Sequence, residues 1–221
     1  PSTNYLLHAT VRWENTGSNA VSLPAQEWVV GTATPMGAYD DGSAVGLMWY
    51  DGNKSHDTTT AYFSDTKFGC MPTTPKAEYR EGASNVVWVA AHNQFFGVVA
   101  MPETPAQQVV ARAIALPRPT EGRFSFTNSP VRKGMETTVT YSALTLDAGK
   151  TLEQRINLFI GPKEYSKLAS IAGRYGNNAD QAMGFGFFGF FAKGLLLIMN
   201  WLHNALSIPY GWAIIVLTVL L

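Results

Sequence analysis

The sequence is poor in the residues that carry most enzyme and metal chemistry. Its 221 residues include one cysteine, Cys70, and four histidines. A lone cysteine excludes an internal disulfide and any cysteine-cluster metal site. The histidines are scattered, and the sequence contains no histidine pair at helical spacing, no glycine-rich phosphate loop and no nucleophile elbow. We therefore expect no catalytic residue, no metal and no cofactor.

Charge is scarce and evenly balanced. Lys and Arg together number 16, as do Asp and Glu, and charged residues make up 14% of the chain. The balance provides no net field for nucleic acid, so a nucleic-acid partner is not expected. The low share indicates that an apolar part is separate from a soluble part. The apolar part begins after Asp180, and Lys193 is the only formally charged residue beyond that point.

The apolar part contains two runs, residues 185–204 and residues 211–221, with Pro209 between them. From Ile208 onward there are fewer residues than the roughly 20 that a helix needs to cross a hydrocarbon core. The chain also begins without an initiator methionine. We expect a fragment of a longer membrane protein, in which a transmembrane helix begins near Ile208 and is truncated.

Before residue 163 the sequence predicts strands and turns. Residues 4–14 alternate between apolar and polar, which is typical of a half-buried strand, and residues 86–91 are nearly all apolar, as in a strand buried on both faces. Residues 109–116 are a strand or a short helix. Further strands are predicted at 21–23, 28–30, 47–50, 61–63, 66–68, 95–101, 124–126, 136–146 and 152–160. This spacing, broken by Gly, Pro, Asn and Asp, is typical of an antiparallel sandwich.

A short helix is predicted over residues 164–172, ended by Gly173 or Gly176. The tail after residue 184 predicts a helix with a narrow polar stripe and a wide apolar face. Such a helix can lie in the headgroup layer of a membrane, with Trp201 at the boundary and Lys193 reaching water. The alternative is a core helix packed under the β domain. The expected membrane-interface residues are Phe188, Phe191, Lys193, Leu195, Ile198, Trp201, Leu202 and Trp212.

Two weak ligand patterns occur in the β part. Asp51, Asn53, Ser55 and Asp57 alternate like the start of a calcium loop, but the glycine and the final glutamate of such a loop are missing. A solvated hairpin loop is the better interpretation. His92 is the one histidine that a sugar-binding fold could use, and we interpret it as a structural or exposed residue.

Several motifs together resemble the YidC family of membrane protein insertases. Two of them lie in the tail: Phe188-Gly-Phe-Phe-Ala-Lys-Gly-Leu-Leu-Leu-Ile-Met-Asn-Trp-Leu-His203 and Gly211-Trp-Ala-Ile-Ile-Val-Leu-Thr218. The others lie in the β part. One is Trp88-Val-Ala-Ala-His-Asn-Gln-Phe-Phe96, and the other is Leu144-Thr-Leu146, which leads to Leu158-Phe-Ile-Gly-Pro-Lys163. The resemblance implies a mainly β antiparallel supersandwich with a mutarotase-like shape, in the periplasm beside a bacterial inner membrane. A membrane-surface helix then leads into the insertase core.

The resemblance also implies a division of the chain and a set of partners. Residues 1–176 would be the periplasmic domain, 177–207 the hinge and surface helix, and 208–221 the start of the first core transmembrane helix. Nascent membrane proteins, the lipid bilayer and the Sec translocon with its accessory subunits are the expected partners. The candidate partner-contact residues are Lys163, Glu164, Tyr165 and Leu168.

The expected function is to help insert and fold inner-membrane proteins, alone or with the Sec translocon, without enzyme chemistry. In the family, a positively charged residue in a groove of the membrane core performs the central step. That position would follow Leu221, so no residue of this chain is expected to supply it. The alternative function is a membrane-tethered carbohydrate-binding or mutarotase-like domain.

Overall fold

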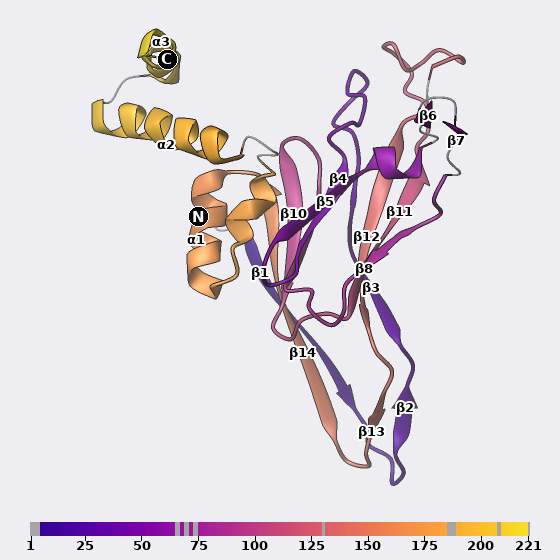
Figure 1. Ribbon diagram of the computed structural model, residues 1–221. Helices are drawn as coiled ribbons and strands as arrows, with labels where there is room; N and C mark the ends of the chain where they lie inside the picture. The colour runs from indigo at the N-terminus through magenta and orange to yellow at the C-terminus, as the bar shows by residue number, and fades with distance from the viewer. Residues whose placement is uncertain are drawn as a thin grey trace. The chain divides into compact units, whose positions relative to one another are not determined.

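The structure is a computed structural model that describes residues 5–64, 67–68, 71–72, 75–129, 131–184, 189–206 and 209–220. It consists of two compact units, Pro1–Ala182 and Met183–Leu221. The first unit contains the β-sheets and one α-helix, and the second contains two α-helices (Figure 1).

Two antiparallel sheets form most of the first unit. The six-stranded sheet has the order β1 (Leu6–Glu14), β14 (Thr151–Pro162), β10 (Phe96–Pro102), β9 (Trp88–His92), β4 (Gly46–Tyr50) and β5 (Ser55–Thr59). The four-stranded sheet has the order β3 (Gln26–Ala33), β12 (Lys133–Tyr141), β11 (Gln108–Ala115) and β8 (Tyr79–Glu81). Two small pairs join β2 (Val21–Leu23) to β13 (Leu144–Leu146) and β6 (Lys67–Phe68) to β7 (Met71–Pro72). The prediction of a mainly β, antiparallel fold is confirmed.

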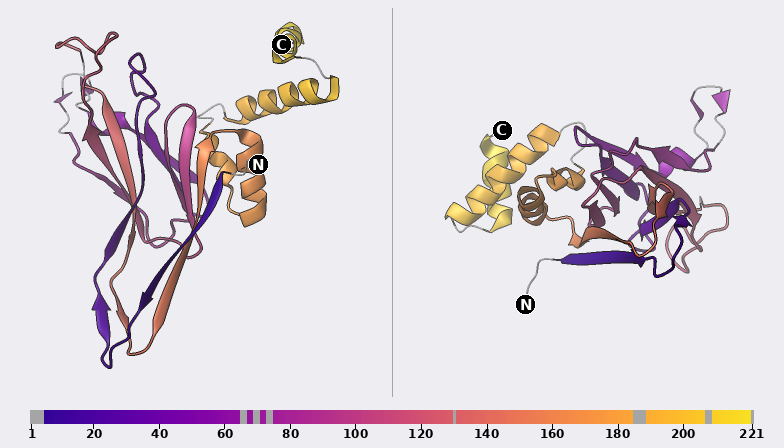
Figure 2. Two further views of the ribbon diagram at one scale, coloured as in Figure 1. Left: turned by 180° about the vertical axis from the view of Figure 1, so that it is seen from behind. Right: turned by 90° about the horizontal axis from the view of Figure 1, so that it is seen from below.

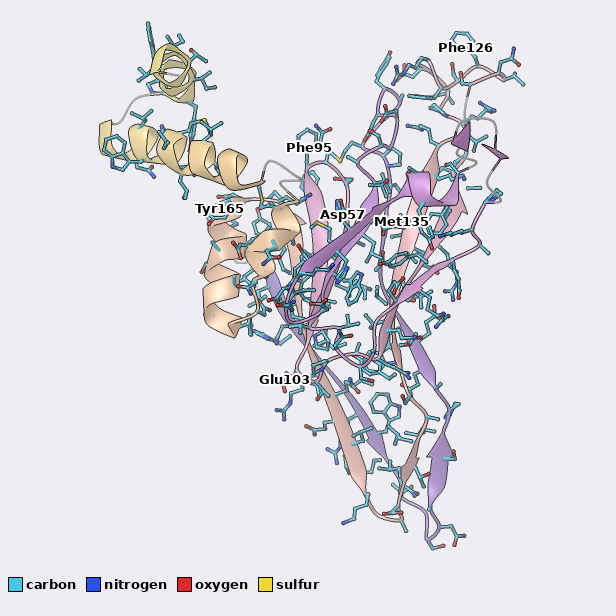
Figure 3. All side chains as sticks on the ribbon, viewed as in Figure 1. Asp57, Phe95, Glu103, Phe126, Met135 and Tyr165 are labelled. Carbon is cyan, nitrogen blue, oxygen red and sulfur yellow. The ribbon has the colours of Figure 1, made fainter. Side chains whose placement is uncertain are left out.

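The main core lies between the two sheets. Leu47 and Val89 come from the six-stranded sheet, Val109 and Met135 come from the four-stranded sheet, and all four are fully buried in one cluster. Met135 is labelled in Figure 3. Aliphatic side chains of this kind contribute about 1.5–3 kcal/mol each when they are buried. The indole Nε1–H of Trp49 donates to the Tyr79 hydroxyl oxygen at 2.9 Å, so this polar group in the core is satisfied.

Helix α1 (Tyr165–Tyr175) and the 3₁₀ helix η2 (Ala179–Met183) follow the last strand of the six-stranded sheet. Leu168 and Ile171 of α1 are buried. The Trp88 Nε1–H donates to the Asn177 carbonyl oxygen at 2.8 Å, which fixes the segment between the two helices to strand β9. Gly176 ends α1 in the left-handed conformation at φ 62°, so the prediction that Gly176 or Gly173 stops the helix is confirmed for Gly176.

Three strand predictions are wrong or incomplete, and some strands were not predicted. Residues 61–63 belong to a 3₁₀ helix, η1 (Thr60–Phe63), since three apolar residues alone do not distinguish a helix from a strand. The region of Phe124 and Phe126 consists of turns, in which Ser125 N–H donates to the Gly122 carbonyl and Ser129 N–H to the Phe126 carbonyl. The run 136–146 breaks after Tyr141 into β12 and β13. The polar strands β5 and β8 were not predicted, because neither has an apolar alternation.

Strand β1 forms as predicted, but less of it is buried than its alternating pattern indicates. It is an edge strand of the six-stranded sheet and pairs with β14 from Leu6 to Glu14 (Figure 2). On its apolar face Trp13 packs against Trp28 of the other sheet, with ring centroids 5.5 Å apart. Leu7, on the same face, is 56% exposed. The apolar face of β1 is therefore covered at one end and open at the other.

Candidate membrane-facing helices and the end of the sandwich

The second unit contains helices α2 (Gly189–Leu206) and α3 (Tyr210–Leu220). Pro209 immediately precedes α3, where its fixed φ angle suits the start of a helix and its missing N–H costs no intrahelical bond. The Pro209 carbonyl accepts the Trp212 N–H at 3.0 Å, which forms the first turn of α3. None of the helices among the described residues is both long enough and apolar enough to span a bilayer.

Large apolar side chains are exposed along both helices. In α2, Trp201 is 62% exposed, and in α3 Trp212 is 63% exposed. The other exposed apolar residues of this unit are Leu195, Leu197, Ile198, Tyr210, Ile214, Ile215 and Val216. A soluble surface seldom carries so many large apolar side chains together, and such a patch is typical of a surface that contacts protein or membrane. We call these nine residues the apolar tail surface.

Most of the predicted interface residues that the structure describes lie on this surface. Leu195, Ile198, Trp201 and Trp212 are exposed, as an interfacial role requires. Leu202 is only 6% exposed, so it stabilises packing instead of presenting a surface. Phe188 lies outside the described residues. Phe191 and Lys193 belong to α2, but their side chains are also outside the described part.

The polar residues of α2 have an internal partner that was not predicted. The His203 ring stacks on the Tyr210 ring with centroids 4.1 Å apart and an interplanar angle of 19°. The Tyr210 hydroxyl donates to Asn200 Oδ1 at 3.4 Å. The polar stripe thus joins α2 to the first residue of α3. The signal in the sequence is the pair of polar residues in an apolar run, followed by an aromatic residue directly after proline.

Thr218 is the polar residue within α3. Its hydroxyl donates to the Ile215 carbonyl oxygen of the same helix at 2.9 Å. The hydroxyl is therefore satisfied inside the helix and does not interrupt its apolar character.

The four candidate partner-contact residues surround the junction of β14 with α1. Lys163 is half-buried, and burial lowers the pKa of its ammonium group, while the nearby Asp57 acts in the opposite direction. The Glu164 carboxylate accepts hydrogen bonds from Lys167 Nζ at 2.8 Å and Ser166 Oγ at 3.0 Å, and these bonds lower its pKa. Tyr165, which Figure 3 labels, is half-buried, whereas Leu168 is 1% exposed and has no surface for a partner.

His92 is buried on the six-stranded sheet. Its Nδ1 lies 3.3 Å from the Asn93 carbonyl oxygen, and its Nε2 lies 3.8 Å from Asp57 Oδ1, too far for a hydrogen bond. This placement agrees with the interpretation of His92 as a structural residue. Among the residues that the structure describes, no group of three His, Cys, Asp or Glu side chains is arranged to hold a metal.

The loop that resembled a calcium site is a hairpin turn between β4 and β5. Asp51 Oδ1 accepts the N–H groups of Asn53 and Lys54, both at 2.7 Å, and Asp51 Oδ2 lies 2.8 Å from His56 Nε2. The bond to His56, followed by those to the backbone, holds the pKa of Asp51 well below its usual value. The carboxylate is committed to the turn, so the prediction of a hairpin loop is confirmed.

The chain thus combines an antiparallel β-sandwich with a helical unit whose surface is apolar. The chain belongs to the family described as the YidC periplasmic domain, whose family model matches residues 2–198. The resemblance drawn from the sequence motifs is therefore confirmed.

Three relatives illustrate the match, and each carries the name membrane protein insertase YidC. That of Neisseria meningitidis serogroup C is 37% identical over 84 residues, which cover 38% of this chain and 14% of the relative. That of Oleidesulfovibrio alaskensis is 32% identical over 107 residues, covering 48% and 19%. That of Geobacter sulfurreducens is 33% identical over 87 residues, covering 39% and 15%. The matched part of this chain thus spans less than a fifth of the length of these relatives.

Proposed function

We propose that this chain is part of a membrane protein insertase, which helps other proteins enter and fold in the inner membrane. The family match and the names of the relatives support an insertase. Within the chain, the proposal rests on the apolar tail surface: the chain that forms the β-sandwich also carries large aromatic and aliphatic side chains that are exposed. Insertases make and break no bonds; they lower the cost of moving polar segments into lipid.

The arrangement that we propose follows the three parts expected from the sequence. Residues 1–176 form the periplasmic domain, with a mutarotase-like supersandwich fold. Residues 177–207 form the hinge and a helix on the membrane surface, and residues 208–221 form the first part of a transmembrane helix. Three features support this division: Gly176 ends α1, Pro209 separates α2 from α3, and Trp201 and Trp212 are exposed on either side of Pro209. Exposed tryptophan is typical of residues at a membrane interface.

We further propose two kinds of partner. Nascent membrane proteins would be the clients, and the Sec translocon with its accessory subunits would be a neighbour in the membrane. The exposed Glu164 and the half-buried Lys163 and Tyr165 support a contact at the end of the sandwich, because the three lie together at the junction of β14 and α1.

The test uses the full-length natural protein that contains this chain. It is reconstituted in liposomes with a newly synthesised single-span client, and protease protection reports the inserted fraction. We expect a larger inserted fraction than in protein-free liposomes. An equal fraction in both samples contradicts the proposal, and so does glucose epimerisation by the protein, which would favour a mutarotase-like activity.

A further inference from the structure

His92 at the end of β9 is a buried histidine, and its Nε2 atom has no hydrogen-bond partner among the described residues. Its Nδ1 atom lies 3.3 Å from the Asn93 carbonyl oxygen. A carbonyl oxygen only accepts hydrogen bonds, so in the neutral ring Nδ1 carries the proton and Nε2 is an acceptor without a donor. An unsatisfied polar atom in a buried position costs free energy, and native structures contain few of them. Packing alone therefore does not account for a histidine at this position.

The imidazole ring of His92 lies between two glycines. His92 pairs with Gly46 of β4 on one side and with Gly97 of β10 on the other, and paired residues share a face of the sheet. A Cβ atom on Gly46 would lie 3.3 Å from His92 Nε2, and a Cβ atom on Gly97 would lie 3.6 Å from His92 Cβ. Neither glycine has a positive φ angle, so the backbone does not require glycine at these positions. The two glycines instead leave space beside the ring.

Two charged side chains approach His92 from other parts of the sheet. Asp57 of β5, which Figure 3 labels, places its Oδ1 atom 3.8 Å from His92 Nε2, and the Asp57 side chain is 56% exposed. Lys163 directly follows β14, and a Cβ atom on Gly97 would lie 3.8 Å from Lys163 Cγ. The stem of Lys163 and the ring of His92 are therefore neighbours across Gly97, while Asp57 reaches the ring from the side of β4.

The carboxylate of Asp57 acts on both of these basic groups. Burial lowers the pKa of the Lys163 ammonium group, and the charge of Asp57 opposes that effect. The acidic residue next to Lys163, Glu164, is already engaged, because its carboxylate lies 2.8 Å from Lys167 Nζ. Within the described part of the chain, Asp57 is thus the carboxylate that these contacts place near both His92 and Lys163.

Protonation changes what the buried Nε2 atom needs. Histidine is the side chain that ordinarily changes its charge between about pH 5 and pH 8. A protonated ring donates from both nitrogens, and a buried charge without a partner is costly, so Nε2 then needs an acceptor. Asp57 Oδ1 lies 3.8 Å away on a partly exposed side chain that has room to rotate. Rotation of Asp57 toward the ring brings the two atoms to the distance of about 2.7–2.9 Å that a charge-assisted hydrogen bond requires.

We propose that His92 and Asp57 form a proton-sensitive switch on the six-stranded sheet. At neutral pH the ring is uncharged, and Asp57 acts on Lys163. At lower pH the protonated ring binds Asp57, which ties the edge strand β5 to β9 across β4 and draws the carboxylate away from Lys163. The switch couples the proton concentration to the anchoring of an edge strand and to the charge at the end of the sandwich. It does not depend on the proposed insertase function.

The test follows the histidines of the 221-residue chain in phosphatidylcholine nanodiscs by nuclear magnetic resonance with ¹³C-labelled histidine. The chain has four histidines, and the signal that disappears in the His92→Gln variant belongs to His92. Hydrogen exchange, expressed as protection relative to an unfolded peptide at the same pH, reports the anchoring of residues 55–59. We expect the His92 signal to change between pH 8 and pH 5, and the protection of residues 55–59 to rise about threefold or more over the same range.

Two variants separate the switch from a general effect of pH. Asp57→Asn keeps the size of the side chain but removes its charge. We expect it to lower the midpoint of the His92 titration by about one pH unit and to abolish the rise in protection. Asp147→Asn, at an exposed position in the turn before β14, is the matched control and should behave like the unmodified chain. Cooperative urea unfolding confirms that both variants fold.

Three results would overturn the proposal. A His92 signal that does not change down to pH 5 shows that the ring stays neutral and is only a structural residue. An equal titration midpoint in Asp57→Asn and the unmodified chain shows that Asp57 is not the partner of the protonated ring. An equal rise in the protection of residues 55–59 in these two proteins shows that the pH acts on the sheet through other groups.

Discussion

Arg112 connects three strands on the outer face of the four-stranded sheet. From β11 its guanidinium donates to both carboxylate oxygens of Glu27 on β3 and, at 3.2 Å, to Glu78 just before β8. The Thr138 hydroxyl of β12 donates to Glu27 at 2.7 Å. A two-pronged arginine contact of this kind has better-defined geometry than an ordinary surface ion pair. The network therefore ties all four strands together at their solvent side.

This network predicts a pH dependence of stability. The hydrogen bond from Arg112 is the largest cause that lowers the pKa of Glu27 in the folded state. A carboxyl group with a lowered folded-state pKa stabilises the fold above its unfolded value of about 4.3, and that contribution is lost as the pH falls through the folded-state pKa. We expect the free energy of unfolding to fall less steeply between pH 6 and pH 3 in Glu27→Gln than in the unmodified chain.

The measurement is the urea midpoint at a series of pH values. At pH 7 we expect Glu27→Gln to lose less than about 1 kcal/mol, because the pair is partly exposed to solvent. The matched control is Glu121→Gln, an exposed loop residue. Parallel curves for Glu27→Gln and the unmodified chain would show that the network does not contribute to the acid sensitivity.

At the scale of elements, Trp88 determines how the segment after the sandwich is fixed to it. Its ring is fully buried on β9 and stacks with Tyr50 of β4, with centroids 5.9 Å apart. Its Nε1–H reaches the Asn177 carbonyl, and Asn178 Nδ2 donates to the Tyr50 hydroxyl at 2.8 Å. Two neighbouring residues of the segment between α1 and η2 are thus bonded to two neighbouring strands.

Replacing Trp88 by Phe keeps an aromatic ring but removes the N–H donor. The buried Asn177 carbonyl then lacks its partner, which costs about 1–3 kcal/mol. We expect the urea midpoint to fall accordingly and hydrogen exchange to become faster in residues 165–183, while residues 108–115 of β11 keep their protection. Uniform acceleration across both regions would indicate a general loss of stability instead of a local release of the helical segment.

The elements also show what the sequence could predict. The fully buried β9 and the long β14 have strong apolar patterns, and both were located to within a few residues. The polar strands β5 and β8 form because neighbouring strands offer them hydrogen bonds, and pairing across the chain leaves no local pattern. The exposure of Leu7 has a similar origin. Alternation predicts that the residue faces inward, but only the width of the opposite sheet decides whether it is covered.

The candidate site was also only partly predictable, because local composition marks some of its residues and the folding of distant segments decides the rest. Leu195, Ile198, Trp201 and Trp212 stand out by composition, since apolar residues without charged neighbours predict a non-aqueous contact. The burial of Leu202 and the stacking of His203 on Tyr210 depend on how the second unit folds. A cavity of about 570 Å³ in the first unit is lined by residues of β3, β9, β10 and β14, four strands from distant parts of the sequence. No motif of the sequence marks it.

For the whole molecule, we propose that the second unit binds a lipid bilayer through the apolar tail surface. Burial of one large apolar side chain contributes about 1.5–3 kcal/mol, so two charged replacements on this surface should weaken binding at least about tenfold. Trp201 of α2 and Ile215 of α3 are both exposed, and so are suited to replacement without disturbing the interior.

Flotation of the 221-residue chain with phosphatidylcholine liposomes containing anionic lipid measures this binding. We expect the unmodified chain to float with the liposomes and the double variant Trp201→Asp, Ile215→Asp to stay largely at the bottom of the gradient. The matched control is Val29→Asp, Phe126→Asp, which adds the same charge at exposed apolar positions of the first unit and should float normally. Equal flotation of the tail double variant and the unmodified chain would contradict membrane binding through the apolar tail surface.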